Sequence, residues 1–354
     1  MDFIEINKRQ YLDSINLNLG TYKPIFRFMN EKEINSVAEK MTMPNGKIFP
    51  IPIFLDIKNK FINKLKKKKR IRVIYNKQLV GYFDSEDIFL CNKKKIAKSI
   101  FGTASIKHPG VKYFLNTSKY FVSGNIKIIK KNIERFNNLD FSPKETRNIF
   151  KKKKWKTIVG FQTRNIPHLG HEFIQKKILE DYGPLFINPL VGEKKRGDFT
   201  INSIIKSYKI LIKKFYPKNK VFFGLLTANM FYAGPREALF HAIIRKNYGC
   251  THFLVGRDHA GISNFYGEYE AQKLVKKFEK KIGIKIIKFK GPFFCKKCNQ
   301  VTNADNCKDY KNKKNIIEIS GTNIRKQLKK GNFNKIVFVR KEVLNSVKNI
   351  NLFL

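Results

Sequence analysis

Two histidines three residues apart, His168 and His171, open an apolar-periodic stretch of the chain. On a helix, positions i and i+3 lie on one face. At a helix start that face also carries unpaired backbone N–H groups and the positive end of the helix dipole. Helix starts of this kind bind phosphate readily. The histidine pair therefore predicts a phosphate-binding corner.

The segment directly before the histidines, Gln162-Thr163-Arg164-Asn165, supplies a second set of donors. Its amide and guanidinium groups suit an oxyanion. No acidic residue lies between Gly160 and His171. The corner therefore offers donors for two anionic groups side by side, which a nucleotidyl transfer from ATP to an inorganic oxyanion requires.

The elements that must position these residues are predicted from the apolar runs around them. Residues 156–161, 221–226 and 251–256 predict buried strands, and residues 235–248 predict a helix between the last two. Strands that alternate with helices form parallel sheets with right-handed crossovers. Ligands of such sheets bind at the carboxyl ends of strands, near a topological switch point. Because 162–171 and 256–260 both directly follow strands, we expect them to share one site.

The extended motif Gln-Thr-Arg-Asn-x-x-His-x-x-His in residues 162–171 resembles the signature of the ATP sulfurylase family, a branch of the HxGH nucleotidyltransferases. Further blocks appear in that family's order at residues 190–198, 232–261 and 319–325. Residues 50–53 and 142–147 also fit, so the resemblance covers nearly the whole chain.

The resemblance implies a fold of the α/β class in three parts. An N-terminal PUA-like α+β barrel domain is expected over residues 1–150, and the short strand-like runs at 71–75 and 120–122 agree with it. A Rossmann-like parallel-sheet catalytic domain is expected over 151–315, with a cysteine knuckle at 295–307. A small C-terminal helical subdomain is expected over 316–354, with Ser320 as a helix N-cap.

The implied reaction joins sulfate to the AMP part of ATP, gives adenosine 5′-phosphosulfate and releases pyrophosphate. By resemblance, sulfate is bound by Gln162, Arg164 and the backbone N–H of Ala260. Five residues would act on the reacting groups: Thr163, Arg164, Asn165, His168 and His171. The remaining ATP contacts would come from Gln162, Gly256, Arg257, Asp258, His259 and Arg325. Mg²⁺ is expected as the counter-ion of ATP.

Three cysteines, Cys295, Cys298 and Cys307, have the spacing of a structural zinc knuckle. Some relatives close such a site with a histidine a few residues further on, but this chain has none there. Asp305 or Asp309 could supply the fourth ligand, or the site has lost its metal.

The formal charge of +46 raises the question of nucleic acid. Most of the basic residues are lysines, and runs such as Lys66–Arg70 are more often solvated faces than binding sites. We therefore expect no nucleic-acid partner. With no apolar run long enough to span a bilayer and no signal-peptide pattern, a cytoplasmic protein without a membrane partner is expected. The resemblance implies a homo-oligomer.

Two other functions remain open at this point. One is another HxGH adenylyltransferase acting on an organic phosphate or mononucleotide. The other is a basic RNA-binding protein with a PUA-like domain, a zinc knuckle and a decayed catalytic half, for which we would expect loss of the histidines or Arg257. The in vivo direction is also open, since sulfur oxidation would run the same site in reverse. His108, His241 and His252 are expected to be structural, and Arg236 to brace either the site or a subunit contact.

Overall fold

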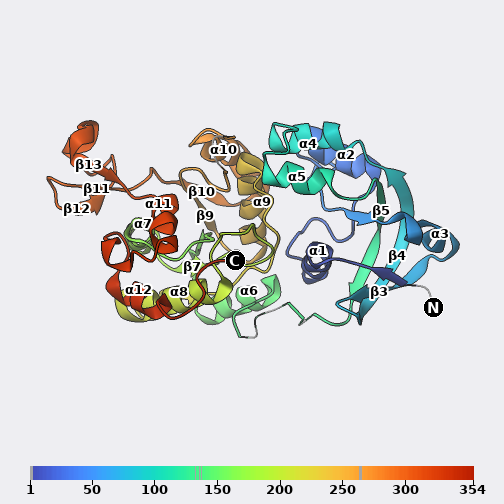
Figure 1. Cartoon of the computed structure of the whole chain (residues 1–354), viewed down its shortest axis with the longest axis horizontal. Coiled ribbons are helices and arrows are strands. Elements are labelled where there is room, and N and C mark those ends of the chain that lie inside the picture. The colour runs from blue at the N-terminus through green and yellow to red at the C-terminus, as the bar shows by residue number, and fades with distance from the viewer. Residues whose placement is uncertain (1–2, 132, 135, 137, 263–264) are drawn as a thin grey trace.

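The computed structural model of the chain describes residues 3–131, 133–134, 136, 138–262 and 265–354. Figure 1 shows an N-terminal half, blue to cyan, beside a half that runs from green to red, with α9 (Gly234–Asn247) facing the first half. No helix in the described part of the chain has the length and apolar character needed to cross a membrane.

The N-terminal half is built on a five-stranded mixed sheet in the order β1-β3-β4-β5-β2. Its strands are β1 (Phe3–Glu5), β2 (Leu55–Ile57), β3 (Arg70–Tyr75), β4 (Gln78–Leu90) and β5 (Tyr120–Ile128). Its helices are α1 (Lys8–Leu19), α2 (Glu31–Lys40), α3 (Asn59–Lys67), α4 (Lys93–Phe101) and α5 (Pro109–Leu115). The strands expected at 71–75 and 120–122 are confirmed, and so is the α+β character of this half.

Local sequence explains where two of these helices begin. Asn7 and Asn30 each accept a hydrogen bond from the backbone N–H three residues on. The side-chain oxygens of Gln10 and Glu33 in turn accept one from the backbone N–H of the cap residue. Such capping boxes pair two otherwise unpaired donors at each helix start.

The second half contains a five-stranded sheet in the order β10-β9-β6-β7-β8, with all neighbours parallel. Its strands are β6 (Val159–Phe161), β7 (Leu185–Ile187), β8 (Val221–Phe223), β9 (His252–Val255) and β10 (Lys285–Lys288). With α9, the helices are α6 (Pro143–Lys152), α7 (Leu169–Asp181), α8 (Ile201–Phe215) and α10 (Glu270–Ile282). The predicted Rossmann-like parallel sheet is confirmed, with strands shorter than the apolar runs.

The order of the strands fixes the place of the switch point. The chain passes from β6 outward through β7 to β8, then returns to β9 on the other side of β6. The switch point therefore lies between β6 and β9. The loops that follow these two strands are the ones that carry 162–168 and 256–260.

The remaining elements form a small antiparallel sheet and a helical tail. The sheet joins β11 (Phe293–Cys295), β12 (Gln300–Thr302) and β13 (Ile316–Glu318). Short 3-10 turns lie at η1 (Lys308–Lys311), η2 (Lys313–Asn315) and η3 (Phe333–Lys335). The tail helices are α11 (Gly321–Lys329), capped by Ser320 as expected, and α12 (Lys341–Val347).

The tail and the parallel sheet share one hydrophobic core. Leu328 on α11 and Val347 on α12 are buried in the same cluster as Val159 and Phe161 of β6. The tail helices are therefore held against the sheet by apolar packing. The division of the chain at residues 150 and 315 stays a prediction.

Polar contacts join the N-terminal half to α9. Arg236 donates to the carbonyls of Val37, Ala38 and Pro50 at 2.7–3.3 Å. Arg236 was expected to brace either the site or a subunit contact. The contacts observed are with the N-terminal half of its own chain.

His108 makes a second connection of this kind. Its Nδ1 accepts from the Gly110 and Val111 N–H groups at the start of α5, and its Nε2 lies 3.0 Å from the Tyr232 carbonyl. The buried ring therefore holds α5 against the loop before α9, which is the structural role expected for this histidine.

Candidate active site

A cavity of about 450 Å³ lies at the switch point. The loops after β6 and β9 form two of its walls, and the start of α11 forms another. The predicted site residues that line it are Gln162, Thr163, Arg164, Asn165, His168, His171, Gly256, Arg257, Asp258, His259, Ala260 and Arg325. The expectation that 162–171 and 256–260 share one site is met in the structure.

The two histidines meet at the start of α7. His168 is the N-cap residue, and its Nδ1 accepts a hydrogen bond from the His171 N–H at 3.2 Å. The rings stack with centroids 3.7 Å apart. A Cβ at Gly170 would lie 3.1 Å from Nδ1 of His168 and 3.2 Å from Cγ of Pro292, so glycine between the histidines leaves room for the first ring.

The histidine pair differs in one respect from a simple helical i, i+3 pair. Because His168 caps the helix, it takes up the His171 N–H, and the Leu169 N–H donates to the Phe338 carbonyl. Fewer backbone N–H groups are therefore free for a ligand than the sequence suggested. The imidazole rings are therefore the groups of this corner that line the cavity.

Both rings are neutral at pH 7. Burial, together with the neighbouring ring, lowers the pKa of His168 well below its usual value, and burial lowers that of His171 to about 4. Since Nδ1 of His168 acts as an acceptor, the neutral ring carries its proton on Nε2. The ring of His168, which lines the cavity, thus has a donor at Nε2.

Arg164 lines the cavity, with Tyr232 and Gly261 as neighbours. Its guanidinium carbon is 5.2 Å from the centre of the Tyr232 ring, and its Nη2 is 3.5 Å from the Gly261 carbonyl. Its Nη1 is buried and has no hydrogen-bond partner among the described residues. Buried donors are rarely left unpaired in native proteins, so this one points to a bound ligand.

Asn165 and Arg325 join the motif loop to the tail. Nη1 of Arg325 donates to Oδ1 of Asn165 at 2.7 Å, and its Nη2 reaches Thr322 Oγ1 at 3.3 Å. Thr163, by contrast, accepts from the Asn165 N–H at 3.1 Å and is 5% exposed. Thr163 therefore shapes the loop, while Arg325 brings a positive charge from α11 to the cavity.

The loop after β9 has an unusual backbone. Asp258 and Ala260 have positive φ angles of 50° and 57°. A Cβ at Gly261 would lie 1.8 Å from Oδ1 of Asp258, so a larger residue there would displace that carboxylate. Arg257 extends from the same loop to within 3.6 Å of Glu318. The turn therefore presents Arg257 and the Ala260 backbone at the cavity.

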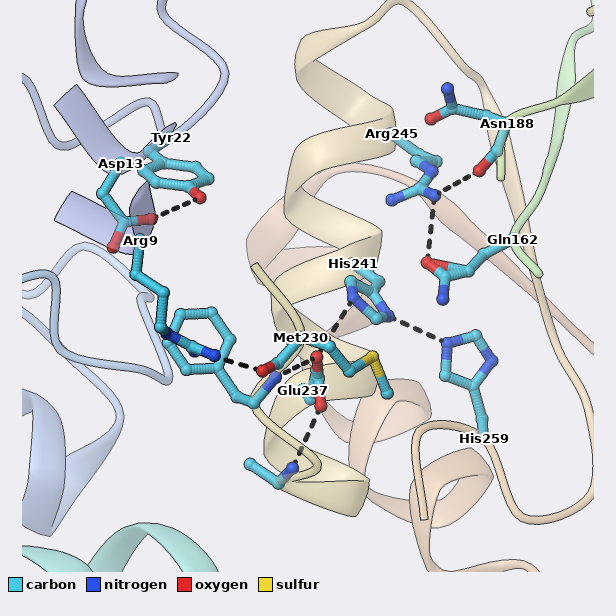
Figure 2. A network of polar contacts seen from close by, with 12 residues as sticks. Arg9, Asp13, Tyr22, Gln162, Asn188, Met230, Glu237, His241, Arg245 and His259 are labelled. Atoms are coloured by element: carbon cyan, nitrogen blue, oxygen red, sulfur yellow. Dashed lines mark hydrogen bonds and ion pairs between the residues drawn. The ribbon is translucent and has the colours of Figure 1, made fainter. Parts of the chain in front are cut away.

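His259 is held by a buried chain of polar groups that Figure 2 shows from close by. Its Nε2 lies 3.2 Å from Nδ1 of His241, and Nε2 of His241 lies 3.5 Å from the Glu237 carboxylate. Glu237 accepts from the N–H groups of Phe231 and Ala233. Burial raises the pKa of Glu237 to about 7 and lowers that of His259 to about 3. His241 thus connects Glu237 to His259 in the cavity wall, and its expected structural role stays a prediction.

Tyr232 joins two of the sequence blocks beneath Arg164. Its hydroxyl accepts from the Lys195 N–H at 2.9 Å and lies 3.2 Å from Oδ2 of Asp198. The backbone of Tyr232 is itself in the left-handed region, with φ 62°. The blocks at 190–198 and 232–238 are thus brought together beneath Arg164, although sequence alone gave Tyr232 no role.

The three cysteines lie together, away from this cavity. Their sulfur atoms are all within 4.8 Å of one another, and Sγ of Cys298 and Cys307 are 3.8 Å apart. Among the described His, Cys, Asp and Glu residues, no fourth joins this group. Each of the two candidate aspartates is paired with a lysine instead: Asp305 with Lys290 at 2.7 Å and Asp309 with Lys297 at 3.5 Å.

Sequence comparisons agree with the geometry. The ATP-sulfurylase family model matches residues 137–349, and a PUA-like domain model matches residues 1–131. The chain is 40% identical to the sulfate adenylyltransferase of Carboxydothermus hydrogenoformans, over 96% of this chain and 90% of the relative. It is also 40% identical to that of Hyperthermus butylicus, over 97% and 87%.

A solved structure has the same fold. The hexameric APS kinase from Thiobacillus denitrificans superposes with a TM-score of 0.72 at 18% identity. The match covers 98% of this chain and 62% of that one.

A parallel sheet with an HxGH motif at its switch point defines a nucleotidyltransferase of the HxGH class. Within that class, the chain belongs to the ATP-sulfurylase family. The predicted family, the PUA-like N-terminal domain and the assignment as an enzyme are thereby confirmed. His168, His171 and Arg257, whose loss the RNA-binding alternative required, all line the cavity.

Two buried residues near the site were missed by sequence reasoning. Glu172 follows His171 and is paired with Arg340 at 2.6 Å, which ties α7 to the start of α12. Arg245 is fully buried on α9 and contacts Gln162. The available signal was an acid directly after the motif and an arginine that follows the apolar pair Ile243-Ile244.

Proposed function

We propose that this cavity holds ATP and sulfate together, with the residues of the motif loop between them. The reaction is that of a sulfate adenylyltransferase, in which ATP and sulfate give adenosine 5′-phosphosulfate and pyrophosphate. The observation that carries the residue-level proposal is the buried Nη1 of Arg164. This cationic donor has no hydrogen-bond partner among the described residues and lines the same cavity as the two neutral histidines.

In this proposal, sulfate lies against Gln162, Arg164 and the backbone N–H of Ala260. The cationic fork of Arg164 matches two oxygens of a tetrahedral dianion. The side-chain oxygen of Gln162 is occupied by Arg245, which leaves its NH₂ group as the donor for a ligand. The positive φ of Ala260 supports a role for its backbone, since it belongs to a turn that wraps the cavity.

ATP is proposed to lie across the remaining walls. His168 and His171 would donate to its phosphates, and Thr163, Arg164 and Asn165 would orient the reacting oxygens. Gly256, Arg257, Asp258 and His259 would hold the nucleotide, and Arg325 a terminal phosphate. Two observations support this arrangement. A Cβ at Gly256 would meet nothing within 4 Å, and Arg325 reaches the cavity through its bond to Asn165.

The chemistry needs alignment and charge neutralisation more than proton transfer. A sulfate oxygen attacks the α-phosphorus, and the bond from that phosphorus to the bridging oxygen of pyrophosphate breaks. Sulfate is already ionised, so no general base is required. The residues instead offset repulsion between two anions, hold them in line and stabilise charge that develops on the leaving oxygen. The neutral histidines and the three arginines, Arg164, Arg257 and Arg325, suit that role.

The counter-ion, the assembly and the location are proposals of the same kind. Mg²⁺ would enter with ATP, held by the nucleotide and water. We further propose a homo-oligomer, as for the hexameric structural neighbour, and a cytoplasmic location.

Direct attack predicts that exchange of labelled pyrophosphate into ATP depends on sulfate. The wild-type protein should catalyse this exchange with sulfate present and at background rate without it. The measurement is incorporation of ³²P-pyrophosphate into ATP at several sulfate concentrations. Exchange at full rate in sulfate-free buffer would indicate an adenylyl-enzyme intermediate and overturn direct attack.

We also propose that the three cysteines hold a structural zinc ion. Among the described residues, the apolar cluster around them has three buried members, Phe293, Cys295 and Cys307, too few to stabilise a small sheet alone. Three thiolates at this spacing fit zinc, with a fourth ligand from water or from an aspartate that leaves its lysine.

Removal of this metal should loosen the small sheet without stopping catalysis at once. Purified protein is expected to contain about one zinc per chain, and Cys298→Ser is expected to lose it and to lower Tm. Metal content by atomic emission and unfolding by calorimetry measure both effects. Cys91→Ser, a change at an isolated cysteine, is the control. Metal-free wild-type protein whose Tm does not respond to added zinc would contradict the proposal.

A further inference from the structure

Arg245 carries a buried charge for which the described part of the chain offers no carboxylate. The residue is 0% exposed on α9. Its Nη2 donates to Oε1 of Gln162 at 3.0 Å and to the Asn188 carbonyl at 2.9 Å, while Nε and Nη1 have no hydrogen-bond partner among the described residues. Burial lowers its pKa to about 10, so it is still cationic at pH 7. Burying a charge in this way is costly, and function is a common reason to retain it.

A glycine in β6, the strand that leads into the site, leaves space for the side chain of Arg245. A Cβ at Gly160, in the middle of β6, would lie 2.7 Å from Cγ of Arg245 and 3.1 Å from Sγ of Cys250. Its guanidinium carbon is also 5.8 Å from the centre of the Phe253 ring. The stem of Arg245 therefore passes over the glycine of the strand that leads directly into Gln162.

The contact with Arg245 determines which way the Gln162 amide faces. Arginine has only donors, so it can bind the oxygen of an amide and not the nitrogen. Figure 2 shows the Gln162 oxygen on the side of Arg245 and the NH₂ group on the opposite side. Without this contact the amide could rotate by half a turn and present its oxygen to an anion, which would repel it.

We propose that Arg245 is a positioning residue for sulfate, which fixes the amide of Gln162 with its NH₂ group toward the cavity. The inference rests on the proposed sulfate site at Gln162 and Arg164. The charge of Arg245 would also favour binding of an anion, since Arg245 and Arg164 both add positive potential at His259 in the cavity wall. Arg245 itself would touch neither substrate.

The test is a set of variants assayed for the KM of sulfate and of ATP. Arg245→Met keeps most of the buried stem but removes charge and donors. We expect it to raise the sulfate KM by about 10- to 100-fold, the range for losing a hydrogen bond from a charged donor. The ATP KM should change less than about threefold. Arg245→Lys keeps the charge and should fall between Met and the wild type.

A double-variant cycle with Gln162→Met separates positioning from a structural role. If Arg245 acts through Gln162, Arg245→Met should change the sulfate KM much less in the Gln162→Met background than in the wild type. Arg236→Met is the matched control, because it removes another arginine of α9, half-buried, that contacts the N-terminal half instead. It should lower Tm without changing the ratio of the two KM values.

Several outcomes would overturn the proposal. Additive effects of the two changes, an equal rise of both KM values, or an unchanged sulfate KM in Arg245→Met would each do so. If Arg245→Met does not fold, Arg245→Lys carries the same cycle. A normal sulfate KM in Gln162→Met alone would instead remove the proposed sulfate site, so the two failures are distinguishable.

Discussion

His168→Asn is expected to lower kcat by about 10² to 10³-fold, the usual cost of losing one preorganised transition-state donor. Asparagine is a good N-cap residue, so its side-chain oxygen can replace Nδ1 as the acceptor for the His171 N–H. The variant therefore keeps the start of α7 and loses the Nε2–H donor. Steady-state kinetics in both directions measure the loss.

Two comparisons make this result specific to catalysis. His168→Ala removes both the cap and the donor, so it should lose as much activity and also unfold at a lower temperature. His252→Asn is the control, because His252 begins β9 at the end of the strand opposite the cavity. Wild-type kcat in His168→Asn would show that the ring serves only as a helix cap.

Arg164→Ala is expected to lower kcat/KM for sulfate by about 10³-fold, because it removes both the charge and the fork of donors that face the oxyanion. Arg164→Lys should recover only part of this loss, since an ammonium group offers a point charge without bidentate geometry. Varying sulfate at saturating ATP gives kcat/KM for sulfate, and varying ATP at saturating sulfate gives kcat/KM for ATP.

Arg147→Ala provides the matched control for arginine loss. Arg147 donates to the carbonyls of Asn247 and Lys246 on the outside of the fold, at 2.7 and 2.8 Å. Its loss should reduce stability and leave both substrate constants near wild type. If Arg164→Ala behaved like Arg147→Ala, Arg164 would have no role in oxyanion binding.

Much of the site could be predicted because its signals are local. The motif residues follow a short apolar strand and precede a periodic helix, and the alternation of such strands with helices determines a parallel sheet. The block at 256–260 follows β9, the strand beside β6 in the sheet. Topology alone therefore brings it beside 162–171. The structure has both loops at the switch point between β6 and β9.

The contacts that hold the site residues in place could not be predicted in this way. Arg325 meets Asn165 across 160 positions of the chain, and Arg245 meets Gln162 across 83. Pairings of this kind depend on how α9 and α11 pack on the sheet, which periodicity does not specify. The capping role of His168 was also missed, because the sequence pattern does not distinguish an N-cap from the first helical turn.

The reverse reaction tests most directly whether one cavity binds both substrates and transfers the adenylyl group between them. Purified protein would be mixed with adenosine 5′-phosphosulfate, pyrophosphate and Mg²⁺, with luciferase reporting ATP. We expect rapid ATP formation by the wild type and a loss of about 10²-fold or more in His168→Asn. Folded wild-type protein that forms no ATP would contradict the account, and equal rates in the two proteins would remove His168 from it.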